Sequence, residues 1–333
     1  MRQSIISIYE YLGKKTYSPM PIQEIIFRQP YHNLGLAYSF NFTKSFFAPI
    51  STAQISIQNP SADMINALRF DPAKPMERPK IEIRAGESNF RLDSIGLINT
   101  FKTSPGMDLV YTGHPYFFTE NKFPGGKTLN ISCSDMDAPD RQERSNKTFR
   151  QGEITILLAL QSLLANTKCD FTGIQALAST KLQATIYSNN LNVQSQILPD
   201  LSRVYKFHYF RTSDGTLKFE MAGAKTDGDK TQIVSPSTGL IEYPTQINWC
   251  FWNIKTFFGR PQIFYPGQWM TVDMTGSTAN IQSFGKGGIK DVFKVKSGMV
   301  TEAKYNFNDT SAEILYIISP DGYPVESMAV LDI

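Results

Sequence analysis

Hydrophobic and polar residues alternate along several short stretches of the chain. In YSFNFTKSF at 38–46, Tyr38, Phe40 and Phe42 fall on one side of an extended strand, and small polar residues fall on the other. Residues that favour turns follow such stretches. The same alternation recurs at 53–59, 80–86, 128–135, 262–274, 292–298 and 312–319. The pattern therefore predicts a mainly β protein in which antiparallel strands dominate.

A tight hairpin is predicted within VYKFHYFRTSDGTLKFEM at 204–221. Asp214-Gly215 readily adopts the positive φ angles of a short turn, and apolar residues alternate on both sides of it. We therefore expect two antiparallel strands that meet at this pair.

Helical patterns are confined to two segments. Ser61 is a favourable N-cap for a short helix at 61–70, and Asp63 suits the positive end of the helix dipole. The second segment, 152–166, is expected to form one long helix that is apolar around most of its circumference. Such a helix needs cover on more than one side, so we expect Leu158 to be buried.

Two polar stretches divide the chain into parts. DMDAPDRQERSNKTFRQ at 135–151 separates the first strands from the long helix, and AGAKTDGDKTQ at 222–232 follows the hairpin. We therefore predict four parts: an N-terminal arm (1–34), a first β domain (35–138), a middle α+β domain that holds the helix and the hairpin (139–232), and a second β domain (233–333).

Composition places the chain among ordinary globular proteins. It has 333 residues, of which 33 are basic and 30 are acidic, so its net charge is +3. Charge so evenly balanced offers no concentrated attraction for nucleic acid or anionic lipid. The longest strongly apolar stretch, 154–165, is too short to span a membrane. The N-terminus has no signal-peptide cleavage pattern, so we expect the protein to be made in the cytoplasm.

The sequence contains no recognisable catalytic, nucleotide-binding or metal-binding motif. His32, His114 and His208 are far apart, and none has a second ligand at metal-binding spacing. We expect His114 in a turn and His208 at a surface or interface. Asp135 and Asp137 are interpreted as a solvated turn rather than as a cation site or an acid–base pair. The chain is therefore predicted not to be an enzyme and to need no cofactor or metal.

The order of several blocks resembles one protein family. FFAPISTAQISIQNPSADMINALRF at 46–70 carries an A-x-I-x-I-x-N strand pattern followed by a short helix, and NKTFRQGEITILLALQSLLA at 146–165 leads into a leucine-rich helix. Between them lie PKIEIRAG at 79–86 and TLNISCSDMD at 128–137. In this order the blocks are similar to the baseplate hub proteins of contractile-tailed bacteriophages and related injection systems.

Two later blocks extend the resemblance. IVSPSTGLIEYPTQ at 233–246 resembles the segment that leads a hub chain into its last β unit, and PQIFYPGQWMTVDM at 261–274 resembles the strand that follows. Proline fixes φ and lacks a backbone donor, while glycine adopts conformations closed to other residues. These blocks are therefore expected to form a structural joint, made by Pro236, Gly239, Pro244, Pro266 and Gly267.

The resemblance implies a structural role and two tail-tube-like antiparallel β-barrel units in each chain. Three copies would form a homotrimeric ring that adapts the six-fold tail tube to the three-fold central spike and leaves a channel for DNA. The implied partners are further copies of the chain, the central spike protein, the tail tube protein, and tape measure and wedge proteins. DNA would be passing cargo only, no membrane insertion is implied, and the protein would reside in the baseplate of the virion tail after assembly in the host cytoplasm.

A carbohydrate-binding or receptor-binding tail module is the alternative interpretation. Trp249, Trp252 and Trp269 lie in aromatic runs and could stack on sugar rings. The same tryptophans could instead anchor the core or the contacts between subunits.

Overall fold

The computed structural model describes most of the chain. The described residues are 2–13, 16–29, 38–45, 51–71, 74, 77–87, 107–135, 144–222, 232–247, 251–257, 263–274, 295–308 and 312–319. Trp249, His32 and Asp137 lie outside them.

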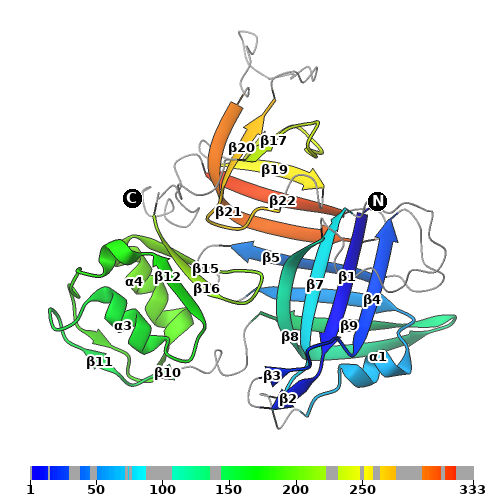
Figure 1. The fold of residues 1–333 in the computed structure, drawn as a ribbon, viewed down its shortest axis with the longest axis horizontal. Coiled ribbons are helices and arrows are strands. Elements are labelled where there is room, and N and C mark those ends of the chain that lie inside the picture. The colour runs from blue at the N-terminus through cyan, green and yellow to red at the C-terminus, as the bar shows by residue number, and fades with distance from the viewer. Residues whose placement is uncertain are drawn as a thin grey trace.

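Strands from both ends of the chain join in one large sheet (Figure 1). The main path of hydrogen-bonded strands runs in the order β18-β19-β22-β21-β5-β6-β9-β8-β7-β1-β4. Off this path, β20 pairs with β21, and β17 pairs with β20. Every pairing among these strands is antiparallel except that of β17 with β20. The strands are β1 (Arg2–Tyr9), β4 (Gln23–Gln29), β5 (Tyr38–Ser45), β6 (Thr52–Gln58), β7 (Lys80–Glu87), β8 (Met107–Phe123), β9 (Gly126–Ser134), β17 (Gln232–Val234), β18 (Thr245–Gln246), β19 (Trp252–Phe257), β20 (Trp269–Asp273), β21 (Val295–Phe307) and β22 (Ala312–Ser319).

The long strand β8 connects two parts of this sheet. Its first half pairs with β7 and its second half pairs with β9, with irregular register at residues 115–117. The N-terminal segment belongs to the same sheet, because β1 pairs with both β4 and β7. A small hairpin of β2 (Tyr11–Gly13) and β3 (Thr16–Tyr17) lies between β1 and β4. Residues 2–29, which the sequence analysis sets apart as an arm, therefore contribute strands beside the first β domain.

The pairing of β5 with β21 joins the N-terminal strands to the C-terminal ones. Aromatic rings stack across this pair: the centroids of Phe42 and Tyr305 lie 4.3 Å apart, and those of Phe40 and Phe307 lie 5.2 Å apart. The inward side chains of both β parts form one core cluster that includes Tyr38, Phe40, Ile55, Tyr305 and many others. The first and last β parts therefore share a sheet and a core.

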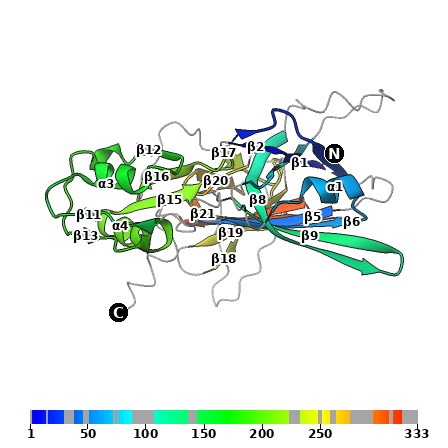
Figure 2. The same ribbon diagram turned by 90° about the horizontal axis from the view of Figure 1, so that it is seen from below.

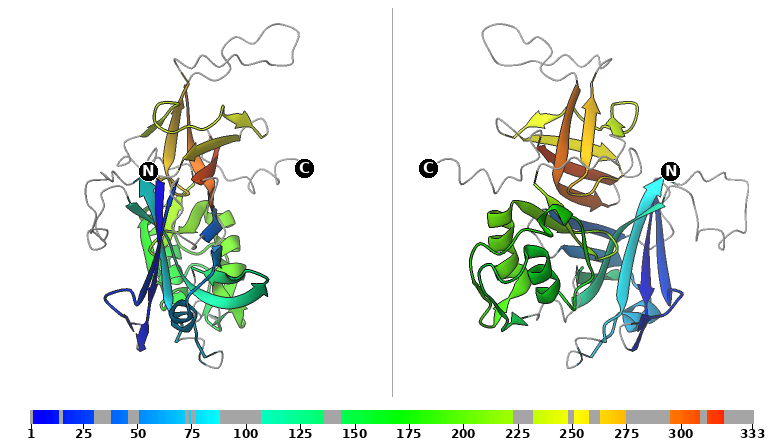
Figure 3. Two further views of the ribbon diagram at one scale, coloured as in Figure 1. Left: turned by 90° about the vertical axis from the view of Figure 1, so that its right-hand side faces the viewer. Right: turned by 60° about the vertical axis from the view of Figure 1, so that its left-hand side comes forward.

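Residues 144–222 form a separate unit with a core of its own, drawn in green (Figures 1 and 3). Its strand β16 lies between β15, with which it pairs antiparallel, and β12, with which it pairs parallel. Two helices pack on this unit, α3 and α4. The elements are β10 (Arg144–Ser145), β11 (Thr148–Phe149), α3 (Ile156–Leu163), β12 (Cys169–Gly173), a 3-10 turn (Gln175–Leu177), β13 (Ile186–Tyr187), β14 (Leu191–Asn192), a π-helical turn (Val193–Ile197), α4 (Leu198–Tyr205), β15 (Phe207–Arg211) and β16 (Leu217–Met221).

The predicted short helix and the predicted hairpin are both confirmed. α1 covers Ala62–Ala67, and the Ser61 side chain accepts a hydrogen bond from the Met64 backbone nitrogen at 3.1 Å. β15 and β16 form the hairpin, and Gly215 in its turn has φ of 81°. Helix α4 (Leu198–Tyr205) takes up the first two residues of the predicted hairpin segment. Pro199 lies in its first turn, and Lys206 ends it in a left-handed conformation with φ of 56°.

The predicted long helix is shorter and more exposed than expected. Gly152 takes a positive φ of 74°, and Thr155 caps α3 by accepting a hydrogen bond from Leu158 N at 3.4 Å, so the helix begins at Ile156. Leu157, Leu160 and Leu163 face the core, but Leu158 is 55% exposed. The expectation that Leu158 is buried is therefore wrong, because this helix is covered on one side only.

The sequence correctly predicted a mainly β fold with a large antiparallel sheet and few helices. The division into four domains and the barrel form of the two β parts stay predictions. No helix in the described part of the chain is long and apolar enough to cross a membrane.

Leu160 and Leu158 provide a matched test of which side of α3 is buried. Leu160→Ala should lower the free energy of unfolding by about 2–5 kcal/mol, because it leaves a cavity where a fully buried side chain packed. Leu158→Ala on the exposed side should change it by less than about 0.5 kcal/mol. Urea denaturation followed by circular dichroism measures both, and equal losses would contradict the orientation of α3.

Candidate functional site: a buried joint and a charged sheet face

Three parts of the chain meet at a cluster of buried charged side chains. Lys44 lies on β5, Asp135 follows β9, and Arg211 ends β15 of the middle unit; each of the three is less than a tenth exposed. The Lys44 ammonium donates to the backbone carbonyl oxygen of Arg211 at 3.4 Å. The Arg211 guanidinium donates to the carbonyl oxygen of Gly215 at 2.7 Å and to Gln194 Oε1 at 3.2 Å. The cluster thus ties the hairpin of the middle unit to β5.

Asp135 is buried in this charged cluster rather than exposed in a solvated turn. The interpretation of Asp135 as part of a solvated turn is therefore wrong. Its Oδ1 accepts a hydrogen bond from the Ser51 backbone nitrogen at 2.7 Å. Burial raises the pKa of Asp135 to about 6, and the nearby Arg211 and Lys44 charges limit the rise. Burial lowers the pKa of Lys44 to about 8, and Asp135 opposes this shift. The two groups therefore favour each other's charged form in a site that disfavours both charges.

The middle unit also contacts the last β part, through apolar side chains and one tightly packed glycine. Phe210 on β15 and Met299 on β21 form a small buried cluster, against which Trp269 on β20 packs. Gly267, with φ of 93°, lies so close that an added Cβ would come within 2.8 Å of both Phe210 Cε1 and Glu220 Oε2. Its backbone nitrogen donates to the Val300 carbonyl oxygen at 2.8 Å. Glycine is therefore required where the last β part touches the middle unit.

The other predicted joint residues lie elsewhere in the last β part. Pro236 is exposed in the turn that follows β17, and Gly239, with φ of 119°, closes that turn before β18. Pro244 is buried just before β18, and Pro266 is buried beside Gly267. The structure thus places these residues in two turns, of which the one at 266–267 packs against the middle unit. That they act as a mechanical joint stays a prediction.

Two of the candidate contact tryptophans are packed within the protein. Trp252 on β19 is 5% exposed and belongs to the main core, and Trp269 is partly buried at the joint. A ring that stacks on a sugar needs an open face. The packing of Trp252 therefore favours its interpretation as a core residue.

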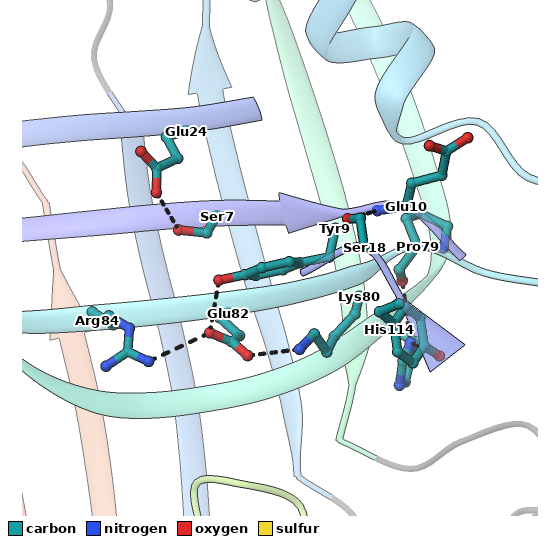
Figure 4. A network of polar contacts seen from close by, with 11 residues as sticks. Ser7, Tyr9, Glu10, Ser18, Glu24, Pro79, Lys80, Glu82, Arg84 and His114 are labelled. Carbon is teal, nitrogen blue, oxygen red and sulfur yellow. Dashed lines mark hydrogen bonds and ion pairs between the residues drawn. The ribbon is translucent and has the colours of Figure 1, made fainter. Parts of the chain in front are cut away.

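A second cluster of charged groups lies on the face of the sheet made by β4, β1 and β7 (Figure 4). Glu82 Oε2 accepts a hydrogen bond from the Tyr9 hydroxyl at 3.2 Å, and its other oxygen lies 2.8 Å from the Lys80 ammonium. Arg84 lies 3.6 Å from Glu82, and Ser7 donates to Glu24 at 3.4 Å. Burial, and then the Glu82 charge, raise the pKa of Tyr9 to about 12. This network of paired charges ties β7 and β4 to the N-terminal strand.

Of the two described histidines, His114 takes a different place from that expected. His114 lies within β8 rather than in a turn, and its Nδ1 donates to the Pro79 carbonyl oxygen at 3.1 Å. Its ring stacks on Tyr17 of the small hairpin, with centroids 5.5 Å apart. His208 is buried on β15 of the middle unit. In the described residues, no group of three or more histidine, cysteine, aspartate or glutamate side chains could hold a metal ion.

Sequence comparisons give no relative, but solved structures share this fold. No family model and no curated protein matches the chain. A tail protein from Neisseria meningitidis matches over 96% of this chain and 99% of its own, with 11% identity and a TM-score of 0.55. A 43 kDa tail protein of prophage MuSo2 from Shewanella oneidensis matches over 97% and 98%, with 9% identity and a TM-score of 0.54.

A third similar structure is a chain of the Francisella PdpA-VgrG complex. It matches over 97% of this chain and 59% of its own, with 8% identity and a TM-score of 0.53. This chain thus spans less than two thirds of that protein. At such low identities the likeness concerns the fold, and the chain has the fold of phage tail proteins.

The pH dependence of stability should reveal the buried Asp135. Because folding raises its pKa, Asp135 is easier to ionise in the unfolded chain, and stability is lost as the pH rises from about 4 to about 6. The free energy of unfolding of the wild type should therefore fall by about 2–3 kcal/mol relative to that of Asp135→Asn over this pH range. Urea denaturation between pH 4 and pH 7 measures the difference.

Asp170→Asn serves as the control. Hydrogen bonds from Thr172 lower the pKa of Asp170, so its contribution to the pH dependence of stability falls below pH 4. A flat difference between wild type and Asp135→Asn would contradict the assignment.

A comparison of Gly267 with Gly125 distinguishes the cost of backbone strain from the cost of a steric clash. Both have positive φ, 93° and 99°, but an added Cβ at Gly125 would meet no atom within 4 Å. Gly267→Ala should therefore destabilise the protein by about 1–3 kcal/mol more than Gly125→Ala, because Phe210 is buried and has little room to move. Thermal denaturation of both variants tests this, and equal losses would show that the contact is unimportant.

Proposed function

We propose that this protein is the structural hub of a phage-type tail, a homotrimeric ring that connects the tail tube to the central spike. The observation that carries the proposal is the likeness of fold to two tail proteins, which extends over nearly the whole of each chain. A likeness over so much of the chain concerns the whole assembly of β parts and middle unit rather than one module. The proposed role is non-enzymatic and needs no cofactor.

The arrangement of the sheet supports an adaptor between symmetries. Each chain contributes two β parts that are held together through β5 and β21. If each part is one tube-like unit, three copies present six such units in a ring. Six units match a six-fold tube, whereas three chains match a three-fold spike, and heterologous contacts close the ring.

The proposed partners follow from this position. Further copies of the chain would lie beside it, the tube protein on one side and the spike on the other, with tape measure and wedge proteins as additional neighbours. The similar chain in the PdpA-VgrG complex is itself part of an assembly, which supports a role in contacts between proteins. DNA would pass through the ring as cargo, and the protein would reside in the tail of the virion.

The mass of the purified chain in solution tests the ring. Light scattering across a concentration series should give three times the chain mass of 37.5 kDa, because a permanent ring interface buries enough surface to persist on dilution. The Leu158→Ala variant is the control, since its change lies on the exposed side of α3. A single-chain mass at every concentration would contradict the proposal.

A further inference from the structure

The middle unit meets the β parts through one of its hairpins. Figures 1 and 2 show the β15–β16 hairpin at the end of the middle unit that lies nearest to β5 and β21. The apolar cluster of this contact holds Phe210 and Met299, against which Trp269 packs. The apolar core of the middle unit is separate from that of the β parts. A small contact between two units that each have a core allows them to move relative to each other.

Two buried charges make this contact costly to form. Lys44 and Asp135 are 3% and 5% exposed. The Lys44 ammonium donates to the Arg211 carbonyl oxygen, 3.4 Å away. Asp135 Oδ1 accepts a hydrogen bond from the Ser51 nitrogen, but within the described residues Asp135 Oδ2 has no hydrogen-bond partner. Water would solvate both charges if the middle unit moved away, so docking carries a desolvation cost that these contacts offset only in part.

Other charged groups around this pair keep their charge near neutral pH or face elsewhere. Arg211 stays protonated at any ordinary pH. Burial opposes the ionisation of Asp214, but hydrogen bonds from neighbouring side chains hold its pKa well below the usual range. Glu302 and Lys304 of β21 pair with the strand neighbours of Lys44 and so lie on the opposite face of β5. Near neutral pH, the titration of the cluster therefore concerns Lys44 and Asp135.

A buried histidine lies on another side of the same hairpin. His208 on β15 pairs in register with Glu220 on β16, which lies 2.7 Å from the Lys218 ammonium and packs beside Gly267. Histidine ordinarily titrates near neutral pH. His208 therefore needs a control of its own in any measurement of how pH acts on this contact.

We propose that the middle unit docks reversibly against the β parts, and that Lys44 and Asp135 make this docking weakest near neutral pH. The proposal concerns a movement within one chain and does not depend on the proposed ring. Both charged groups are buried when the unit is docked and reach water when it is not. Each therefore favours docking most strongly in its neutral form.

The two groups lose their effect on docking in opposite directions of pH. Burial raises the pKa of Asp135 to about 6, so its contribution to docking is lost as the pH rises from about 4 to about 6. Burial lowers the pKa of Lys44 to about 8, so its contribution is lost as the pH falls from about 10 to about 8. Between pH 6 and pH 8 both groups are charged, and docking is weakest.

The rate at which a buried thiol reacts measures how often the contact opens. Ser213 lies in the turn of the hairpin, is buried, and lies beside the hydroxyl of Tyr265 in the last β part. Ser213→Cys is therefore placed in a chain that also carries Cys169→Ser and Cys250→Ser, and the buried Cys133 stays. The reagent is dithiodipyridine, which reacts with the thiolate once the thiol is exposed.

The reaction is followed at pH 5, pH 7 and pH 9. Each rate is divided by that of an exposed thiol at Tyr187→Cys, where the side chain is 69% exposed, to correct for the effect of pH on thiol reactivity. The corrected rate should be highest at pH 7 and about tenfold lower at pH 5 and at pH 9, since each change of pH neutralises one of the two buried groups. A corrected rate that does not vary with pH would overturn the proposal.

Variants assign each side of the pH profile to one residue. Asp135→Asn should abolish the fall at pH 5 and keep that at pH 9, and Lys44→Met should do the reverse. His208→Gln is the control and should keep both. If His208→Gln abolishes the fall at pH 5 while Asp135→Asn keeps it, the assignment to Asp135 is overturned.

Leu160→Ala separates undocking from unfolding. Leu160 belongs to the separate core of the middle unit, so its truncation destabilises that unit without changing the contact with the β parts. The corrected rate at Ser213→Cys should therefore stay the same in this variant. A rate that rises with the loss of stability would show that the thiol reacts only when the middle unit unfolds, and reversible docking would be overturned.

Discussion

The antiparallel pairing of β5 with β21 is the interaction on which the rest of the structure depends. It joins strands from opposite ends of the chain, and the stacked pairs Phe42–Tyr305 and Phe40–Phe307 cover it on the core side. Closing so long a loop costs conformational entropy, but this cost grows slowly with loop length and is offset by the burial of large aromatic surfaces. The two β parts consequently share one sheet and one core.

The middle unit is attached in a different way. It has its own apolar core, and it meets the β parts through the buried Lys44, Asp135 and Arg211 together with a small apolar cluster. Buried charges are expensive to desolvate, so such a cluster adds little net stability, although removal of one partner leaves an uncompensated buried charge. Gly267 adds a contact that admits no larger residue. These features define how the middle unit is held against the β parts.

The two exposed faces of the sheet differ in chemistry although their strands are built alike. One carries the paired charges around Glu82, and the other carries uncharged hydroxyl and amide groups on β5, β6 and β9. The overall charge balance of the chain does not show this separation, because it averages over both faces.

The sequence by itself determined the secondary structure where the pattern is local. Alternation predicted β5, β6, β7, β9 and β22, and the Ser61 cap and the Asp214-Gly215 turn predicted α1 and the β15–β16 hairpin. Tertiary structure decided the rest, because long-range packing sets which face is covered. It exposed Leu158, buried Asp135 against Arg211 from another unit, and placed residues 2–29 beside β7. No local pattern contains these contacts, since each joins residues that are distant in the chain.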